Sequence, residues 1–335
     1  MIKRLIISRT DGIGDVILTL PVAGLMKKLH PGVKIWFVGR SYTGPVITAC
    51  EHIDHFINWD EISAYTSLKK IQYFKDIHAD AIVHVFPNKE LARIAYQCKI
   101  PLRVGTSHRF HHWLYCNRLV QVGRKKSPLH EAQLNALLFR PLGVKATPSL
   151  NELIPLMGLT RPAELDGAFA RWLDPSRFNL ILHPKSKGSA REWGLENFSE
   201  LIRTLPKECY KIFISGSAED GMALQGQIEA WGNDVTDITG KMPLAQFIAF
   251  IHKADGLVAA STGPLHIAAA LGKVAVGLYA PMRPIHPGRW APLGPRAGYI
   301  VLDKLCNQCR HDNRCACIEN IKPADVVLKL EQLKV

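Results

Sequence analysis

A turn of small residues between an apolar segment and a helical segment is the part of this chain best suited to bind an anion. Residues 256–260 predict a buried strand, residues 262–264 a tight turn, and the residues from Leu265 onward a helix. The first N–H groups of a helix lack partners, and the helix dipole adds positive charge there. A diphosphate can therefore bind at this turn, within reach of His266 in the first helical turn.

A second candidate site follows the first predicted strand, residues 5–8. Gly12 and Gly14 allow a bulky group to approach the backbone, and Asp15 stands where the loop becomes a helix. A carboxylate in this position can take the proton of an acceptor hydroxyl, although Asp15 is also suited merely to stabilise the helix N-terminus. The dinucleotide pattern G-x-G-x-x-G fails, because Ile17 occupies the third glycine position.

A third candidate site is the cationic loop at residues 183–193, which follows another predicted strand. Lys187 and Arg191 are its best candidates for binding phosphate oxygens through charge-assisted hydrogen bonds. The alternative is a solvated basic loop without a ligand. Glu219, which follows the next strand, suits either a ribose hydroxyl or a simple surface position at a helix start.

The elements that position these sites alternate between strand and helix along both halves of the chain, the pattern of parallel α/β architecture. One helix is expected over residues 16–29 and another over residues 163–172. All three candidate sites follow strands, where ligands bind in open α/β sheets. The predicted division is an N-terminal domain at 1–158, a connection at 159–174, a C-terminal domain at 175–321 and a terminal helix at 322–335.

Composition supports a globular protein with an anionic partner. The chain has 335 residues and a formal net charge of +13. Residues 1–165 carry 22 Lys and Arg against 12 Asp and Glu, and the remainder carries 20 against 17. This asymmetry favours a phosphorylated lipid, a membrane surface or nucleic acid as partner, although solubility alone is an alternative. No nucleic-acid module is found, so we expect no nucleic-acid partner. No secretory or membrane-spanning segment is found either, and we expect a soluble cytoplasmic protein.

The basic residues of the first half surround an aromatic segment at residues 110–115. Arg109, which precedes this segment, and Trp113, which lies within it, are candidates to contact an anionic acceptor or a membrane surface. Packing of Trp113 into the core is the equally simple alternative.

Four of the eight cysteines form a cluster with the spacing C-x₂-C-x₅-C-x-C. Four thiolates can complete a tetrahedral zinc site, but the closing C-x-C differs from common zinc patterns. We favour reduced thiols, with a structural rather than catalytic zinc as the alternative. The cluster consists of Cys306, Cys309, Cys315 and Cys317.

Taken together, these motifs resemble glycosyltransferase family 9, the ADP-heptose–lipopolysaccharide heptosyltransferases. The resemblance covers nearly the whole chain. It rests on residues 12–15 with Thr19 and Pro21, on the loop from His183-Pro184 to Arg191-Glu192-Trp193, and on residues 261–268.

The resemblance implies a GT-B fold, in which two Rossmann-like domains face each other across a cleft. It implies an inverting transferase, without metal or other cofactor, that moves heptose or a related sugar from an ADP-sugar to a lipopolysaccharide inner-core acceptor at the inner face of the cytoplasmic membrane. The alternatives are a different nucleotide sugar, or a protein of this fold that binds nucleotide or glycan without turnover. Asp15 is the implied general base. Arg191 falls where well-studied relatives carry Lys, and Ser261 falls where many relatives carry Asp. The implied donor-binding residues are Ser186, Lys187, Arg191, Glu219, Ser261, Thr262, Gly263 and His266, and the candidate acceptor-binding residues are Gly12, Gly14, Arg109 and Trp113.

Overall fold

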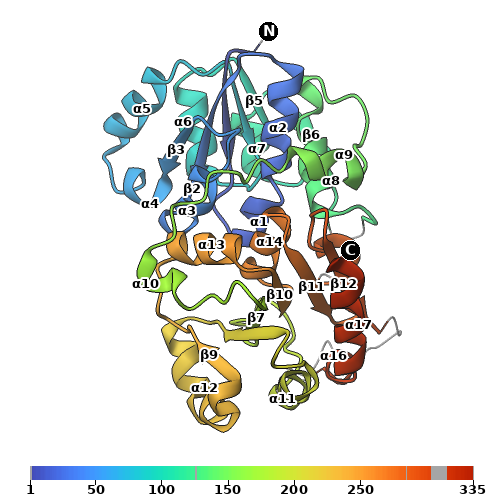
Figure 1. Ribbon diagram of the computed structural model, residues 1–335. Helices are drawn as coiled ribbons and strands as arrows, with labels where there is room; N and C mark the ends of the chain where they lie inside the picture. Colours follow the sequence, from blue (N-terminus) through green and yellow to red (C-terminus); the bar gives the residue numbers. More distant parts are fainter. Residues whose placement is uncertain (1, 125–126, 284, 303–314, 335) are drawn as a thin grey trace. The chain divides into compact units, whose positions relative to one another are not determined.

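The computed structural model describes residues 2–124, 127–283, 285–302 and 315–334. The chain divides into two compact units, Met1–Arg161 and Pro162–Val335. Each unit contains one six-stranded sheet in which every pairing is parallel, with helices covering the sheet (Figure 1). Within the described ranges, no helix is both long and apolar enough to cross a bilayer.

The sheet of the first unit has the order β3-β2-β1-β4-β5-β6. Its central strand carries Leu5, Ile6 and Ile7, which are fully buried, as expected for a strand covered on both faces. The strands are β1 (Arg4–Ser8), β2 (Lys34–Gly39), β3 (His55–Asn58), β4 (Ala81–His84), β5 (Leu102–Thr106) and β6 (Arg118–Val120).

The sheet of the second unit has the order β12-β11-β10-β7-β8-β9. Numbered within its own unit and read from β9, this is the order 3-2-1-4-5-6, the same as in the first unit and typical of Rossmann folds. The strands are β7 (Phe178–His183), β8 (Tyr210–Ile214), β9 (Val235–Asp237), β10 (Gly256–Ala260), β11 (Val274–Tyr279) and β12 (Ala297–Val301).

Most helices connect successive strands, as parallel pairing requires. The first unit contains α1 (Ile13–Ile17), α2 (Leu20–Leu29), α3 (Gly44–Thr48), α4 (Trp59–Ile62), α5 (Ser67–Asp76), α6 (Lys89–Gln97), α7 (Phe110–Tyr115), α8 (Glu131–Leu137) and α9 (Leu150–Leu153). The second contains α10 (Gly167–Ala170), α11 (Leu195–Thr204), α12 (Ala218–Trp231), α13 (Leu244–Lys253), α14 (Gly263–Ala270), α15 (Pro287–Trp290), α16 (Ala316–Glu319) and α17 (Pro323–Lys334).

Two expected helices differ from the structure. The single helix expected over residues 16–29 is wrong, because α1 ends at Ile17 and α2 begins at Leu20. A continuous helix would place Pro21 in its interior, without the N–H that bonds the carbonyl of Ile17. The helix expected over residues 163–172 is only four residues long, and the Asp166 side chain caps its start by accepting the N–H of Ala168.

Candidate active site

The loop after β1 is organised by a buried arginine. Arg9 is 3% exposed, and its guanidinium binds the carboxylates of both Asp11 and Asp15. The Nε–Oδ1 distance to Asp11 is 2.7 Å. Burial, together with the neighbouring charge of Asp15, raises the pKa of Asp11 to about 6, although Arg9 opposes the shift. Asp15, the predicted base, is thus held by an ion pair while its side chain stays 26% exposed.

The same guanidinium also binds two polar side chains on α8. Arg9 Nη1 donates to Glu131 Oε1 at 3.2 Å and to Asn135 Oδ1 at 3.0 Å. Arg124 also donates to both residues, at 3.0 Å each. Glu131 and Asn135 are fully buried. Sequence reasoning missed this network. The available signal was a charged residue placed directly after an apolar strand, and a pair of polar residues one helical turn apart.

Gly12 and Thr19 fix the backbone around Asp15. A Cβ at Gly12 would lie 3.1 Å from Asp15 Oδ2, so a side chain there would crowd the carboxylate. The Thr19 hydroxyl donates to the carbonyl oxygen of Asp15 at 2.8 Å and accepts from Asn135 Nδ2 at 3.1 Å. The structure therefore brings Gly12, Gly14 and Asp15 together in α1 and the residue before it.

The aromatic segment forms α7, which follows β5. Arg109 is exposed, and Trp113 is 63% exposed, with its indole N–H donating to the carbonyl of Ser107 at 2.9 Å. Packing of Trp113 into the core, left open by the sequence, is excluded by this exposure. Because β1 and β5 belong to one parallel sheet, the Asp15 loop and the start of α7 lie at the same edge of it.

In the second unit, the predicted anion-binding turn lies between β10 and α14. Thr262 is the residue before the helix and has extended backbone geometry, and Pro264 is the second helical residue. The Thr262 side-chain hydroxyl is buried, in a residue only 6% exposed, and accepts or donates no hydrogen bond among the residues that the structure describes. His266 is 3% exposed in the first turn of the helix. Burial raises the pKa of Tyr279, and a hydrogen bond with Ser261 opposes that shift.

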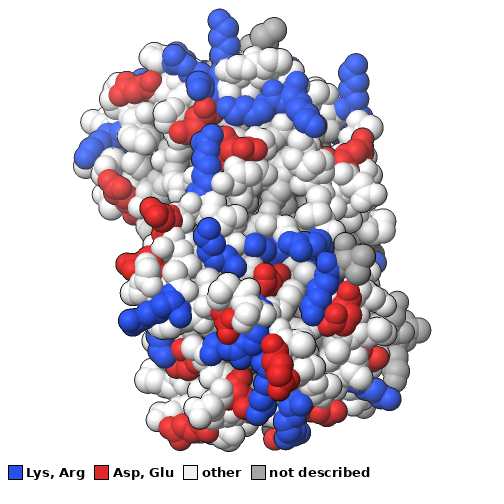
Figure 2. All heavy atoms as spheres, viewed as in Figure 1, with Lys and Arg blue, Asp and Glu red and all other residues white. Residues whose placement is uncertain are grey.

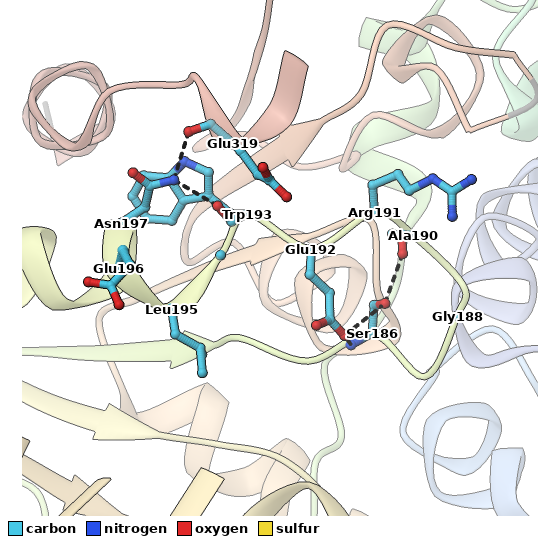
Figure 3. Close-up of a pocket in the computed structure, with 11 residues that line it drawn as sticks. Ser186, Gly188, Ala190, Arg191, Glu192, Trp193, Leu195, Glu196, Asn197 and Glu319 are labelled. Carbon is cyan, nitrogen blue, oxygen red and sulfur yellow. Dashed lines mark hydrogen bonds between the residues drawn. The ribbon is translucent and has the colours of Figure 1, made fainter. Parts of the chain in front are cut away.

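The loop after β7 is held by the carboxylate of Glu192, a residue of the family motif to which the sequence assigned no role. Glu192 accepts the N–H of Ser186 at 3.0 Å and binds Lys185 Nζ at 2.6 Å. The Ser186 hydroxyl donates to the carbonyl of Ala190 at 2.8 Å. Figure 3 shows Arg191 extending away from this contact. Ser186 and Arg191 both line a pocket of about 670 Å³ that continues along residues 192–197 to Glu319.

Two further donor candidates lie beside each other. Lys187 Nζ is 3.8 Å from Glu219 Oε2, and their side chains are 58% and 83% exposed. The strands that precede these loops, β7 and β8, pair with each other, and β7 also pairs with β10. The carboxyl ends of all three strands therefore lie at one edge of the sheet, which places the donor candidates at the same edge as the α14 turn.

The cysteine cluster is described only in part. Cys306 and Cys309 lie outside the described residues, so the structural zinc stays an untested alternative. Cys315 and Cys317 are 1% and 8% exposed and belong to the hydrophobic core of the second unit.

Solved proteins of the same architecture define the class of this chain. The structure of the ADP-heptose lipopolysaccharide heptosyltransferase II of Escherichia coli matches it with a TM-score of 0.75 and 20% identity, covering 99% of this chain and 98% of that one. A family 9 glycosyltransferase from Veillonella parvula matches with a TM-score of 0.80 and 20% identity, over 99% and 97%. The fold is thus the two-domain α/β architecture called GT-B.

Sequence comparison identifies the family within this class. The model of glycosyltransferase family 9 (heptosyltransferase) matches residues 68–318, so the chain belongs to that family and is a glycosyltransferase. A putative glycosyltransferase of Haemophilus influenzae is 27% identical over 304 residues, covering 87% of this chain and 86% of the relative. The lipopolysaccharide core heptosyltransferase OpsX of the same organism is 27% identical over 299 residues, covering 84% and 80%.

Proposed function

We propose that this glycosyltransferase moves a heptose, or a closely related sugar, from an ADP-sugar to a phosphorylated, lipid-linked glycan of the lipopolysaccharide inner core. Membership of family 9 supports the sugar class. A structural relative is an ADP-heptose lipopolysaccharide heptosyltransferase, which supports both the donor and the acceptor. The first unit, residues 1–158 in the predicted division, takes the acceptor, and the second, residues 175–321, takes the nucleotide sugar.

The observation that carries this proposal is how Asp15 is held. Its Oδ1 atom is bound by Arg9, while Oδ2 receives no hydrogen bond from the described residues and the side chain is accessible. Asp15 is therefore oriented, with one oxygen available for a proton. In the proposed step, Oδ2 takes the proton of the acceptor hydroxyl as the hydroxyl oxygen bonds to the anomeric carbon of the donor.

The bond from the anomeric carbon to the diphosphate breaks in the same step, and its electrons leave with ADP. A single displacement of this kind inverts the anomeric configuration. The developing negative charge is met by the first N–H groups of α14, by the Thr262 hydroxyl and by His266. Lys187 and Arg191 are proposed to add positive charge beside the diphosphate, so that the step would need no metal or other cofactor. Ser186 is proposed to contact the donor as well, which requires its hydroxyl to release the carbonyl of Ala190. Glu219 is proposed to bind the ribose.

On the acceptor side, Gly12 and Gly14 allow the acceptor to approach the backbone beside Asp15. Arg109 and Trp113, at the same edge of the sheet, are proposed to contact the lipid-linked acceptor. An acceptor of this kind places the enzyme at the inner face of the cytoplasmic membrane, as a peripheral protein.

Asp15→Asn tests the proposed base. The amide cannot take the proton, so kcat with ADP-heptose and inner-core acceptor should fall about 10²–10⁴-fold. ADP binding, measured by calorimetry, should stay unchanged because α14 and its turn are intact. Asp76→Asn, on exposed α5, is the matched control and should retain wild-type kcat. Unchanged turnover in Asp15→Asn would refute the assignment.

The donor is tested separately by thermal shift with ADP, UDP and GDP and their sugars, because a ligand that binds only the folded state raises its melting temperature. The largest shift is expected with the ADP series. A larger shift with UDP or GDP would show that the donor is a UDP-sugar or a GDP-sugar and not an ADP-sugar. Binding without release of ADP in the presence of acceptor would instead indicate a protein that binds without turnover.

A further inference from the structure

Helix α7 has its apolar and polar sides reversed relative to a normal surface helix. Phe110, Trp113 and Leu114 are 78%, 63% and 53% exposed, and their spacing places them on one face. On the other side, His112 is fully buried, and its ring centroid lies 5.6 Å from that of buried His84. The helix thus exposes three large apolar side chains and buries an imidazole.

This exposed face is held rigidly. The Trp113 indole donates to the carbonyl of Ser107 at 2.9 Å, and His112 Nδ1 accepts the N–H of Thr106 at 3.0 Å. Helix α6 packs beside α7, where the rings of Tyr96 and Tyr115 lie 5.9 Å apart. Because these contacts fix α7, its apolar surface is preformed, and little conformational entropy of α7 would be lost when a partner binds.

The segment of chain that contains α7 is strongly cationic. The described residues 81–124 contain seven Lys and Arg but a single acidic residue, Glu90, which binds Lys70 Nζ at 2.7 Å. Lys89 and Arg109 are exposed and close enough to His111 that their charges, after burial, help to lower its pKa. The face shown in Figure 2 carries both acidic and basic side chains in each unit.

We propose that α7 is a membrane wedge: Phe110, Trp113 and Leu114 enter the interface of an anionic lipid bilayer while Lys89 and Arg109 contact its headgroups. Aromatic and leucine side chains flanked by Lys and Arg are typical of interfacial anchors. Leu114 has neither a polar side-chain atom nor an aromatic ring with which to bind a glycan, which favours lipid as the occupant. The start of α7 lies at the same sheet edge as Asp15, so the wedge would hold this edge near a lipid-linked acceptor.

The proposal extends the proposed function, but its test needs neither donor nor acceptor. The full chain is mixed with vesicles of phosphatidylethanolamine and phosphatidylglycerol, or of phosphatidylcholine alone, and bound protein is measured by flotation. Wild-type protein should bind the anionic vesicles at least tenfold more tightly, and added salt should weaken this binding. The triple variant Phe110→Ser, Trp113→Ser, Leu114→Ser should lose at least tenfold in affinity.

A matched control removes exposed apolar side chains elsewhere. Leu68, Met222 and Leu328 are 82%, 72% and 60% exposed on other helices, and their combined replacement by Ser should leave vesicle binding unchanged. Equal losses in the two triple variants, or none in either, would overturn the proposal. The proposal would also be overturned if the α7 variant bound vesicles as wild type does but either had lost its binding of a lipid-free core oligosaccharide or had changed its oligomeric state.

Tryptophan fluorescence gives a second readout that does not depend on a disruptive variant. Among the seven tryptophans, Trp113 is the exposed one, and the others are buried or half-buried. The difference between the spectra of wild type and Trp113→Phe therefore follows Trp113. This difference spectrum should shift to shorter wavelength on anionic vesicles and be quenched by brominated lipid. An unshifted and unquenched difference spectrum would exclude insertion.

Discussion

The two units place charged groups at their strand ends in opposite ways. In the first unit, Arg9 is 3% exposed and joins Asp11, Asp15 and Glu131 in one network. In the second, the side chains of Lys187 and Glu219 are 58% and 83% exposed and make only a long contact of 3.8 Å. The fold thus preorganises the proposed base, whereas we expect the proposed donor ligands to become ordered when the donor binds.

The largest expected effect separates these two kinds of cation. Arg9→Met would remove the cation that Asp11 and Asp15 share and one of the two cations that bind buried Glu131, and loss of a buried ion-pair partner typically costs about 3–5 kcal/mol of stability. Lys187→Met removes an exposed cation and should change stability by less than about 0.5 kcal/mol, while raising KM for the donor. Urea unfolding of both variants measures the contrast. Equal unfolding midpoints would show that the buried network does not stabilise the first unit.

Arg9→Lys sharpens the same contrast. Lysine keeps the positive charge but cannot present the planar set of donors that reaches Asp15, Glu131 and Asn135 together. We therefore expect recovery of much of the stability but little of kcat. Full recovery of kcat would indicate that charge alone, and not orientation, determines the contribution of Arg9.

The second expected effect concerns the α14 turn, where the buried Thr262 hydroxyl has no hydrogen-bond partner among the described residues. Thr262→Val replaces this hydroxyl with a methyl group of similar size, so the stability of the free protein should be unchanged or slightly higher. ADP binding should weaken about tenfold or more, because a hydrogen bond to a charged phosphate is lost. Calorimetric titration with ADP measures this loss, and Thr262→Ser is the control that keeps the hydroxyl. Unchanged ADP affinity in Thr262→Val would remove Thr262 from the donor site.

The local motifs of these sites and their long-range partners differ in what the sequence could reveal. The α14 turn and the Asp15 loop were found because their signals are local: an apolar strand, small residues and a helix start. The partners of Arg9 were missed because Glu131 and Asn135 lie 122 and 126 residues away, and only the fold brings them together. Strand β5 and the edge strands β3, β6, β9 and β12 are not among the strands predicted from the sequence, and β3, β6 and β9 are only three or four residues long, too short for a clear pattern. The sequence likewise did not determine which side of α7 faces solvent, because this depends on which of its residues the rest of the fold buries.

The smallest expected effect tests a feature in which the two units agree. His84 ends β4 and lies 3.2 Å from the hydroxyl of Ser8, while His183 ends β7 and lies 2.9 Å from the hydroxyl of Ser215. Burial lowers the pKa of His84 to about 3 and that of His183 to about 4. Below pH 6.5 the unfolded chain therefore binds more protons at these sites than the folded chain does, so the free energy of unfolding should fall as the pH decreases toward 4. Asp11 acts in the opposite direction between about pH 6 and 4, because its pKa is raised on folding.

Replacing one histidine at a time divides this pH dependence between the units. Asn can keep a hydrogen bond to the neighbouring serine but does not titrate, so His183→Asn should remove about 1 kcal/mol of the stability lost between pH 6.5 and 5.5. His84→Asn should flatten the curve by a similar amount. Urea unfolding at several pH values measures both slopes. If only one substitution flattens the curve, the histidine of the other unit takes up its proton while that unit stays folded. That histidine is then more accessible to water than its burial indicates.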